Sequence, residues 1–381
     1  MKRLVLGDMN NVRDLGGYPC HDGYTKEFRF LRSGMPRDLK DKDLHLLQSK
    51  GITTIIDLRN IFECTQQEDP FRTLPDFTYH NCPMFADGVV PAAPEEMAPA
   101  YLRLATTPDI IAPVWEAIAA AEDGVLFHCT AGKDRTGVVA ALLLWMVGVE
   151  KADILADYIA TQAYVLEAYR KMLADHPDFP YFLTKADLSY IEEFYDNFTA
   201  IYSDPKTYLA AMGISELKAM RIFAKLLGRP MPFIAHKLEY HGPELSSELT
   251  LRTYQADDYM TYCDCYNSAF RPMRVALGLT PECCPNSDEL LNIKDDIFIL
   301  EQNGCLIGSV TVMDGEIDGL IVREHFRHQG IGQSLLHFAI TEIQKRKHFP
   351  ITLHVAEWNQ TALRLYLNNN FIITESEIIQ R

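Results

Sequence analysis

The chain has 381 residues, of which 48% are hydrophobic and 23% charged, so its composition is globular and its length favours two domains. Its formal net charge of −16 disfavours a protein that coats nucleic acid, because the phosphate backbone would repel it on average. Its nine cysteines form neither an even framework nor CxxC pairs, which argues against disulfide stapling and against a structural zinc site.

The N-terminal sequence MKRLVLGDMN lacks the extended apolar core and the cleavage site of a secretory signal. The longest apolar run, residues 138–149, has about a dozen residues, whereas a membrane-spanning helix needs about 20. We therefore expect a buried helix at this run, no transmembrane segment and a cytoplasmic protein.

The first part of the chain has the pattern of an α/β domain. Short β-branched or apolar runs at 51–58 and 124–128 predict buried parallel strands. Helical periodicity follows at 109–121, 136–147 and 152–173, with further helices through residue 227. We expect a central, mostly parallel sheet flanked by helices over residues 1–228.

Periodicity fails over residues 228–248, which hold three prolines and two glycines, so we interpret residues 229–247 as a linker. Residues 248–381 then predict an α+β domain with hairpin turns at Asn303-Gly304 and Asp314-Gly315. Its expected strands are 297–301, 306–313, 316–322, 351–355 and a last one from Phe371, and its expected helices are 331–343 and 360–368.

The sequence HCTAGKDRTG, residues 128–137, places Cys129 six residues before Arg135 where a strand meets a helix. Backbone N–H groups of such a loop and the N-terminus of the helix can hold a phosphate dianion without a metal, and they favour a cysteine thiolate. The planar Arg135 guanidinium can bind two phosphoryl oxygens. The candidate phosphate-binding residues are Thr130, Ala131, Gly132, Lys133, Asp134, Arg135 and Thr136, and we expect the Thr136 hydroxyl to bond the Cys129 sulfur.

A second cysteine has the same spacing to an arginine, in the pair Cys265 and Arg271. That segment has no glycine, and its flanks have the pattern of one amphipathic helix, which cannot curl around a phosphate. We expect Cys265 to be structural.

HCTAGKDRTG resembles the signature of the protein tyrosine phosphatase superfamily, in the version of a bacterial tyrosine phosphatase family with some phosphoinositide activity. NVRDLGGY at 11–18, LRSG at 31–34, and IIDLRN followed by Glu63 also match, so the resemblance covers residues 1–227. It implies that Cys129 forms a phosphocysteine intermediate, which water then hydrolyses. The implied substrate is a phosphotyrosyl or phosphoseryl protein, or a phosphoinositide.

The resemblance also requires a general acid, and two residues are candidates. Asp134 lies inside the loop and is favoured, with pairing to Arg13 or Arg59 as its alternative role. Asp87, in MFADGVV, is either the acid on a closing loop or a solvated turn residue. Lys133 adds either a second positive charge at the mouth, as in phosphatases that accept inositol lipids, or a solvated loop lysine.

Four polar residues lie among glycines and strand ends, and we expect them to support the loop through hydrogen bonds. They are Asn11, Arg13, Asp14 and Arg59.

In the second domain, the glycines of VREHFRHQGIGQSLL, residues 322–336, allow close backbone approach to a pyrophosphate at a helix N-terminus. With WNQTALRLYLNNNF after it and LRTYQADD near the linker, the segment is similar to the Gcn5-related N-acetyltransferases (GNAT). This implies acetyl-coenzyme A between two splayed strands and an amine acceptor. Candidate cofactor-binding residues are Ile321, Val322, Arg327, Gln329, Gly330, Ile331, Gly332, Gln333 and Asn359.

Tyr366 matches the GNAT general acid, and Glu316, or less favourably Asp318, is the candidate base. Each also has an ordinary structural alternative, Tyr366 as a helix residue packed under the last strand. Asn370 replaces the usual glycine before Phe371, which asparagine tolerates because it adopts a left-handed backbone. The sequence thus predicts a bifunctional phosphatase and acetyltransferase. The alternative is a phosphoinositide phosphatase with a non-catalytic, coenzyme-binding or regulatory second domain.

Overall fold

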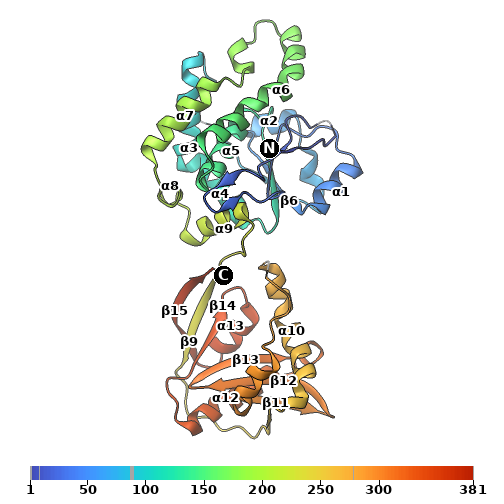
Figure 1. Cartoon of the computed structure of the whole chain (residues 1–381), viewed down its shortest axis with the longest axis vertical. Coiled ribbons are helices and arrows are strands. Elements are labelled where there is room, and N and C mark those ends of the chain that lie inside the picture. Colours follow the sequence, from blue (N-terminus) through green and yellow to red (C-terminus); the bar gives the residue numbers. More distant parts are fainter. Residues whose placement is uncertain (1, 8, 86–89, 278, 381) are drawn as a thin grey trace. The chain divides into compact units, whose positions relative to one another are not determined.

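The chain is described by a computed structural model that covers residues 2–7, 9–85, 90–277 and 279–380. It divides into two compact units, Met1–Arg229 and Pro230–Arg381 (Figure 1). Among the described helices, none is both long and apolar enough to cross a lipid bilayer.

The first unit contains a six-stranded sheet in the order β1-β2-β5-β8-β6-β7. The four strands from β5 to β7 are parallel, and β1 and β2 are antiparallel additions at one edge. This confirms the predicted mostly parallel sheet. The strands, with a separate β3–β4 hairpin, are β1 Lys2–Arg3, β2 Arg13–Asp14, β3 Pro19–Cys20, β4 Gly23–Tyr24, β5 Phe30–Ser33, β6 Ile52–Asp57, β7 Thr78–Asn81 and β8 Gly124–His128.

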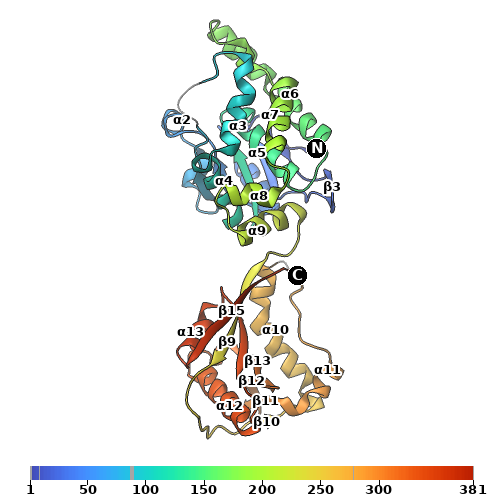
Figure 2. The ribbon, with the colours of Figure 1, turned by 90° about the vertical axis from the view of Figure 1, so that its left-hand side faces the viewer.

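Helices cover both faces of this sheet, because successive residues of its strands are apolar and their side chains point to opposite faces. Ile55 and Leu126 belong to the smaller core beside α1, while Ile56 and Phe127 belong to the larger core on the other face. In Figure 2, α3, α5 and α7 lie side by side over that larger core. The helices are α1 Asp41–Ser49, α2 Ile61–Gln66, α3 Met97–Thr106, α4 Pro108–Ala120, α5 Asp134–Met146, α6 Lys151–Asp175, α7 Leu188–Ile201, α8 Pro205–Ala211 and α9 Glu216–Leu227, with 3-10 turns η1 Pro70–Thr73, η2 Pro94–Glu96 and η3 Tyr181–Thr184.

Helix α5 occupies the centre of the larger core, and every residue from Thr136 to Leu144 is buried. The apolar run that begins at Val138 is therefore a core helix, as its length predicts. Its burial fixes the helix axis, and so it also fixes where the loop before Asp134 lies relative to the end of β8.

The second unit contains a seven-stranded mixed sheet in the order β10-β11-β12-β13-β14-β9-β15. Strands β13 and β14 are parallel and pair only at Glu316 with Thr352 and at Ile317 with Leu353, so they separate beyond these residues. The strands are β9 Phe233–Tyr240, β10 Arg252–Thr253, β11 Ile297–Gln302, β12 Cys305–Met313, β13 Glu316–Val322, β14 Thr352–Ala356 and β15 Phe371–Ile379.

The interpretation of residues 229–247 as a linker is wrong for residues 233–240. They form strand β9, which pairs with both β14 and β15. Pro230, Pro232 and Pro243 flank this strand and do not interrupt it. The eight residues of β9 itself contain neither proline nor glycine, and Leu238 is fully buried in the core. The density of prolines around the strand concealed it in the sequence.

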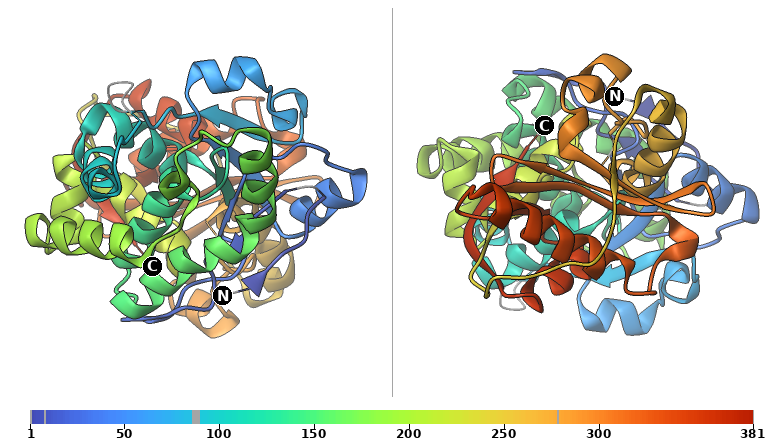
Figure 3. Two further views of the ribbon diagram at one scale, coloured as in Figure 1. Left: turned by 90° about the horizontal axis from the view of Figure 1, so that it is seen from above. Right: turned by 90° about the horizontal axis from the view of Figure 1, so that it is seen from below.

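Helices lie on both faces of the second sheet, as the right-hand view of Figure 3 shows. Ile317 packs in the core beside α12, whereas Ile321, on the same strand, packs in the core beside α10. The helices are α10 Tyr259–Ala276, α11 Ser287–Asn292, α12 Ile331–Arg346 and α13 Gln360–Leu367, with 3-10 turns η4 Ala256–Asp258, η5 Lys294–Asp296 and η6 Glu324–Phe326.

Backbone angles confirm the predicted turns of this unit. Asn303 and Gly304 have φ of 53° and 74°, and Asp314 and Gly315 have 43° and 86°, as two-residue hairpins require. Asn370 adopts a φ of 63°, so asparagine does take the left-handed conformation before β15. Cys265 is buried within α10, which confirms that it is structural.

Candidate active sites

The carbonyl groups of the loop after β8 accept hydrogen bonds from residues outside the loop. The carbonyl of Thr130 accepts from Met35 N at 3.1 Å, and that of Gly132 accepts from Asn11 Nδ2 at 2.7 Å and Arg32 Nη2 at 2.8 Å. Asn11 Nδ2 also donates to the carbonyl of Ala131 at 3.3 Å. Because these carbonyls are held outward, the amide groups of the loop remain available to an anion beside Cys129.

Gly132 allows this arrangement. Its φ is 66°, and a Cβ there would collide with the backbone of Ser33 and Gly34 at the end of the neighbouring strand β5. The loop can therefore pack against β5 only when residue 132 has no side chain.

Cys129 is 3% exposed at the start of this loop, and α5 begins five residues later at Asp134 with no side-chain cap. The first turn of α5 thus presents its positive end to the loop. The Thr136 hydroxyl is buried and has no hydrogen-bond partner among the described residues, so the predicted bond to the Cys129 sulfur is not formed in this structure.

Arg135 is held by the carboxylate of Glu63, a residue that matches the family pattern but for which we predicted no role. Its two terminal nitrogens donate to Glu63 at 2.6 and 2.7 Å, and Thr130 Oγ1 donates to Glu63 Oε1 at 2.6 Å. Burial opposes ionisation of Glu63, but the hydrogen bonds from Arg135 and Thr130 lower its pKa to about 2. The guanidinium plane is therefore fixed before any substrate arrives, and Arg135 Nε–H donates to no group among the described residues.

Asp134 pairs with neither Arg13 nor Arg59. Its carboxylate accepts a hydrogen bond from the Tyr101 hydroxyl and another from Lys133 Nζ at 2.9 Å, and its side chain is 35% exposed. Asp87, the other candidate acid, lies outside the described residues.

Both roles predicted for Lys133 are wrong. The side chain is fully buried, and its Nζ donates to Asp134 and to the carbonyl of Lys185 at 2.8 Å. The ammonium group supports Asp134 and the segment before α7, and it is neither a free charge at the mouth nor a solvated loop lysine.

Tyr169, on α6, lies close to the same space. Burial and the charges at Asp134 and Cys129 raise the pKa of its hydroxyl, while the charge of Arg135 acts in the opposite direction. Tyr169 therefore lies near enough to Cys129, Asp134 and Arg135 for each of them to act on its hydroxyl.

Asn11 is positioned by a buried charge cluster. Arg13 donates to Asn11 and, at 3.2 Å, to Asp157, which is also bound by Arg32. Burial opposes ionisation of Asp157, but the charges of Arg32 and Arg13 lower its pKa. The predicted support of the loop is thus direct for Asn11 and indirect for Arg13.

Asp14 and Arg59 have other partners. Asp14 accepts hydrogen bonds from Gly16 N and Phe28 N, which are not part of the loop. Arg59 binds Asp57 through three contacts of 2.6 to 3.1 Å. The predicted support of the loop is thus indirect for Arg59, whose Nη1 contacts Met35, and stays a prediction for Asp14.

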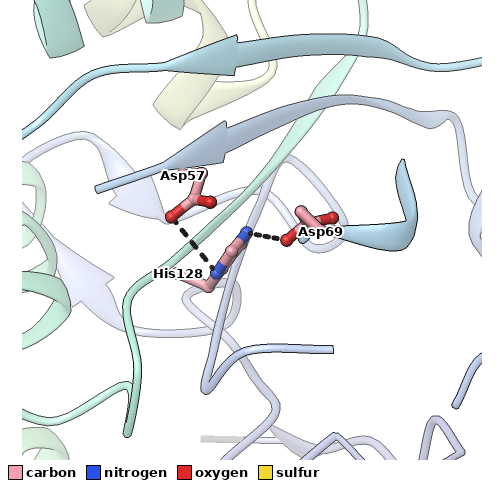
Figure 4. Close-up of side chains that lie close together, drawn as sticks. All are labelled: Asp57, Asp69 and His128. Atoms are coloured by element: carbon pink, nitrogen blue, oxygen red, sulfur yellow. Dashed lines mark ion pairs between the residues drawn. The ribbon is translucent and has the colours of Figure 1, made fainter. Parts of the chain in front are cut away.

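Arg59 instead belongs to a buried cluster around His128, the residue before the nucleophile. Figure 4 shows the imidazole between two carboxylates, with Nε2 3.1 Å from Asp69 and Nδ1 3.9 Å from Asp57. These three residues could present metal ligands, but both oxygens of Asp57 already accept hydrogen bonds from Arg59. The cluster fixes the end of β8, from which Cys129 follows.

In the second unit, α12 begins at Ile331 after Gly330, which has a φ of 81° and provides no side-chain cap. His328, two residues earlier, also has a positive φ, of 62°. Space around Gly330 is open, since a Cβ there would meet nothing within 4 Å. The first amides of α12 are therefore accessible to an anionic ligand.

Other candidate cofactor-binding residues differ in burial and in their hydrogen-bond partners. Ile321 is buried and Val322 half-buried at the end of β13. Arg327 Nε donates to the Val322 carbonyl at 3.1 Å, and Gln333 Nε2 contacts Asn369 Oδ1 at 3.4 Å. Asn359 caps α13, accepting from Ala362 N at 3.3 Å.

Among the described residues, no hydrogen bond joins Glu316 to Tyr366, the predicted base and acid. Glu316 lies where β13 and β14 still pair, and it binds His354 Nδ1 at 2.8 Å. Tyr366 is 8% exposed on α13, and its burial and the charge of Asp318 raise its pKa to about 12. Asp318 is therefore near enough to Tyr366 for its charge to act on that hydroxyl.

Comparison with known proteins assigns each domain to a family. Residues 4–228, more than half of the chain, match the tyrosine phosphatase family. The chain belongs to the tyrosine phosphatase family. Residues 264–371 match the acetyltransferase (GNAT) family, so a phosphatase domain is followed by an acetyltransferase domain.

The phosphatase domain has named relatives. A tyrosine-protein phosphatase of Nostoc commune is 36% identical over 150 residues, which is 37% of this chain and 51% of that protein. The triple specificity protein phosphatase PtpB of Mycobacterium tuberculosis is 55% identical over 42 residues, 11% of this chain and 15% of that protein. The chain thus spans about half the length of the Nostoc relative and less of PtpB.

Solved structures are also similar to parts of this chain. TpbA of Pseudomonas aeruginosa has 18% identity and a TM-score of 0.27, covering 54% of this chain and 91% of that one. The PaiA N-acetyltransferase of Thermoplasma acidophilum, solved in complex with coenzyme A, has 17% identity and a TM-score of 0.27, covering 32% of this chain and 87% of that one.

Sequence reasoning gave Glu63 no role in the phosphatase site, and it missed Tyr101 and Tyr169. Glu63 was recognisable, since it follows β6, and the carboxyl ends of β6 and β8 must meet at one edge of a parallel sheet. Tyr101 and Tyr169 gave no such signal, because they come from α3 and α6, whose positions depend on tertiary packing.

Proposed function

We propose that the phosphatase domain hydrolyses phosphate monoesters of the phosphotyrosine type through a phosphocysteine intermediate. The observation that carries the proposal is the outward binding of the carbonyls of Thr130, Ala131 and Gly132. This leaves a ring of amides around the Cys129 sulfur, and such a ring stabilises both a thiolate and a phosphoryl dianion. Arg135 closes the ring in an orientation that Glu63 fixes.

In this mechanism the Cys129 sulfur attacks phosphorus as the bond to the ester oxygen breaks. Asp134 gives a proton to the leaving oxygen and later takes one from the water that hydrolyses the phosphocysteine. Its partial exposure and its position beside the loop support this role, and Tyr101 and Lys133 hold its carboxylate in place.

The site as proposed needs no metal, and this sets the first test. We expect the full chain to release p-nitrophenol from p-nitrophenyl phosphate at the same rate with and without EDTA. A phosphotyrosyl peptide should be hydrolysed faster than soluble inositol phospholipids, since Lys133 is buried. Loss of activity in EDTA, or activity on the lipids alone, would contradict the proposal.

For the second domain, we propose acetyl transfer from acetyl-coenzyme A to an amine. The residues present fit the coenzyme, because the uncapped start of α12 offers amides for a pyrophosphate and β13 and β14 separate after Ile317. Acetyl-coenzyme A would supply the activated acyl group. Asp318 would take a proton from the amine, and Tyr366 would protonate the departing thiolate.

Binding of the coenzyme can be measured without turnover. We expect acetyl-coenzyme A at 100 times its dissociation constant to stabilise the chain by about 2.7 kcal/mol, seen as a rise in melting temperature. Tyr366→Phe should retain this rise and lose most of the acetyl transfer, because it removes a proton donor and keeps the ring. No rise in the unaltered chain would contradict coenzyme binding.

A further inference from the structure

Helix α10 is followed by a segment that runs back along it, residues 279–285, which we call the return segment. In Figure 2 this segment runs beside α10 to the start of α11. Arg274 Nε, near the end of the helix, donates to the carbonyl of Thr280 at 2.5 Å, and Arg271 Nη2 lies 3.3 Å from the carboxylate of Glu282. Earlier positions of the helix therefore meet later positions of the return segment.

Asn267 fixes the end of the return segment on the helix. Its Oδ1 accepts hydrogen bonds from two successive backbone amides, Cys283 N at 2.7 Å and Cys284 N at 2.9 Å. Cys263 lies about one turn before Asn267 on α10, and its sulfur is 2.6 Å from that of Cys284. The contacts that bring the two thiols together come from an amide side chain and from the backbone, so they do not depend on the sulfur atoms.

Both thiols of this pair are within reach of solvent. Cys263 and Cys284 are half-buried, whereas Cys265, on the same helix, is 1% exposed. Cys265 belongs to a core that also contains Tyr262 from α10 and Leu290 from α11. A small solute can therefore reach the pair, and a bond between its sulfurs would join two elements that pack against one core.

A metal ion is a poor partner for these two sulfurs. Structural zinc takes four ligands in a tetrahedron. Among the described residues, the one close group of three potential metal ligands is Asp57, Asp69 and His128, in the other unit. An S–S bond needs only two sulfurs and is about 2.05 Å long, so a small movement of the two side chains suffices to form it.

We propose that Cys263 and Cys284 form a reversible disulfide when the chain meets a hydroperoxide. One thiolate attacks the peroxide, the O–O bond breaks, and the sulfur becomes a sulfenic acid as water or an alcohol leaves. The other thiol attacks that sulfur, which forms the S–S bond and releases water. The two thiols lose two electrons and two protons in total, and these reduce the peroxide.

The surroundings of Cys284 favour one order of these steps. Burial, together with the hydrogen bond and the charge of Cys263, raises the pKa of Cys284. Because the thiolate is the reactive form, Cys263 is the expected site of the first oxidation. A sulfenic acid at Cys263 no longer carries that negative charge, so Cys284 then loses its proton more readily and completes the bond.

The disulfide would replace a weak attachment by a covalent one. The ion pair of Arg271 and Glu282 is exposed, and such pairs contribute little to stability. An S–S bond between residues 263 and 284 would close a loop and remove the open conformations that the reduced chain can adopt. We expect the backbone amides of the return segment to exchange with solvent at least about tenfold more slowly in the oxidised chain.

The test treats the full chain with hydrogen peroxide, blocks the remaining thiols with iodoacetamide, and digests the unfolded chain with trypsin in the absence of reductant. Trypsin cleaves after Arg274, so Cys263 and Cys284 lie on different peptides that only a disulfide keeps together. We expect mass spectrometry to detect the joined peptides after peroxide and to lose them after dithiothreitol. Separate peptides after peroxide, or unchanged amide exchange in the return segment, would overturn the inference.

Cys283→Ser is the matched control, because it removes a thiol one residue away and keeps the backbone amide that donates to Asn267. This variant should retain the joined peptides, whereas Cys284→Ser should lose them. Should Cys284→Ser fail to give a folded melting curve, Cys263→Ser provides a second test with the same loss expected. Joined peptides in either of these two variants would contradict the assignment, and neither readout depends on phosphatase or acetyltransferase activity.

Discussion

Replacing Cys129 with serine is expected to lower kcat for p-nitrophenyl phosphate by a factor on the order of 10⁴ or more, because the hydroxyl is a far weaker nucleophile than the thiolate. Binding of inorganic phosphate should persist. The loop carbonyls are held by Asn11, Arg32 and Met35, and none of these contacts involves the Cys129 side chain. Steady-state kinetics and calorimetry with phosphate would measure the two effects separately.

Cys82→Ser is the matched control for this variant. Cys82 is 5% exposed in the same domain, and its sulfur donates to the carbonyl of Pro113 at 3.4 Å, a bond that a serine hydroxyl can also make. Its kcat should stay near that of the unaltered chain. A Cys129→Ser variant with near-normal turnover would contradict the phosphocysteine mechanism.

The parts of the structure that follow local rules could be predicted from the sequence. The strand before Cys129 is a short apolar run, the loop contains the glycine that close packing requires, and α5 is a continuous apolar helix. The hairpins at Asn303 and Asp314 followed from turn chemistry alone. In each case the residues that determine the geometry lie within a few positions of one another.

The features that could not be predicted depend on partners far away in the sequence. Strand β9 is stable because it lies between β14 and β15, more than a hundred residues later, and nothing near residue 233 indicates those partners. The side chain of Lys133 is buried because the Lys185 carbonyl accepts from it. Asp318 lies at a bulge where β13 leaves β14, and both the bulge and the separation of the strands depend on pairing with distant segments.

Arg135→Lys is expected to lower kcat/KM by about 10²- to 10³-fold, the usual cost of removing one donor that stabilises transition-state charge. A lysine offers one point charge, so it cannot keep both contacts to Glu63 and also present a planar edge to the phosphoryl oxygens. Affinity for inorganic phosphate should fall as well, which distinguishes this variant from Cys129→Ser. Arg103→Lys, on the exposed side of α3, is the control and should change neither quantity.

The same substitution should change the acid stability of the phosphatase domain, because it weakens the hydrogen bonds that hold the pKa of Glu63 at about 2. A carboxyl with a lowered pKa stabilises the fold fully above its unfolded pKa of about 4.3 and loses this contribution as pH falls towards the folded value. In Arg135→Lys the pKa of Glu63 should rise, so between about pH 2 and 4 the free energy of unfolding should depend less steeply on pH. Equal pH dependence of the free energy of unfolding in the two proteins would contradict the role given to Glu63. It would mean that the ion pair of Glu63 with Arg135 does not stabilise the folded state.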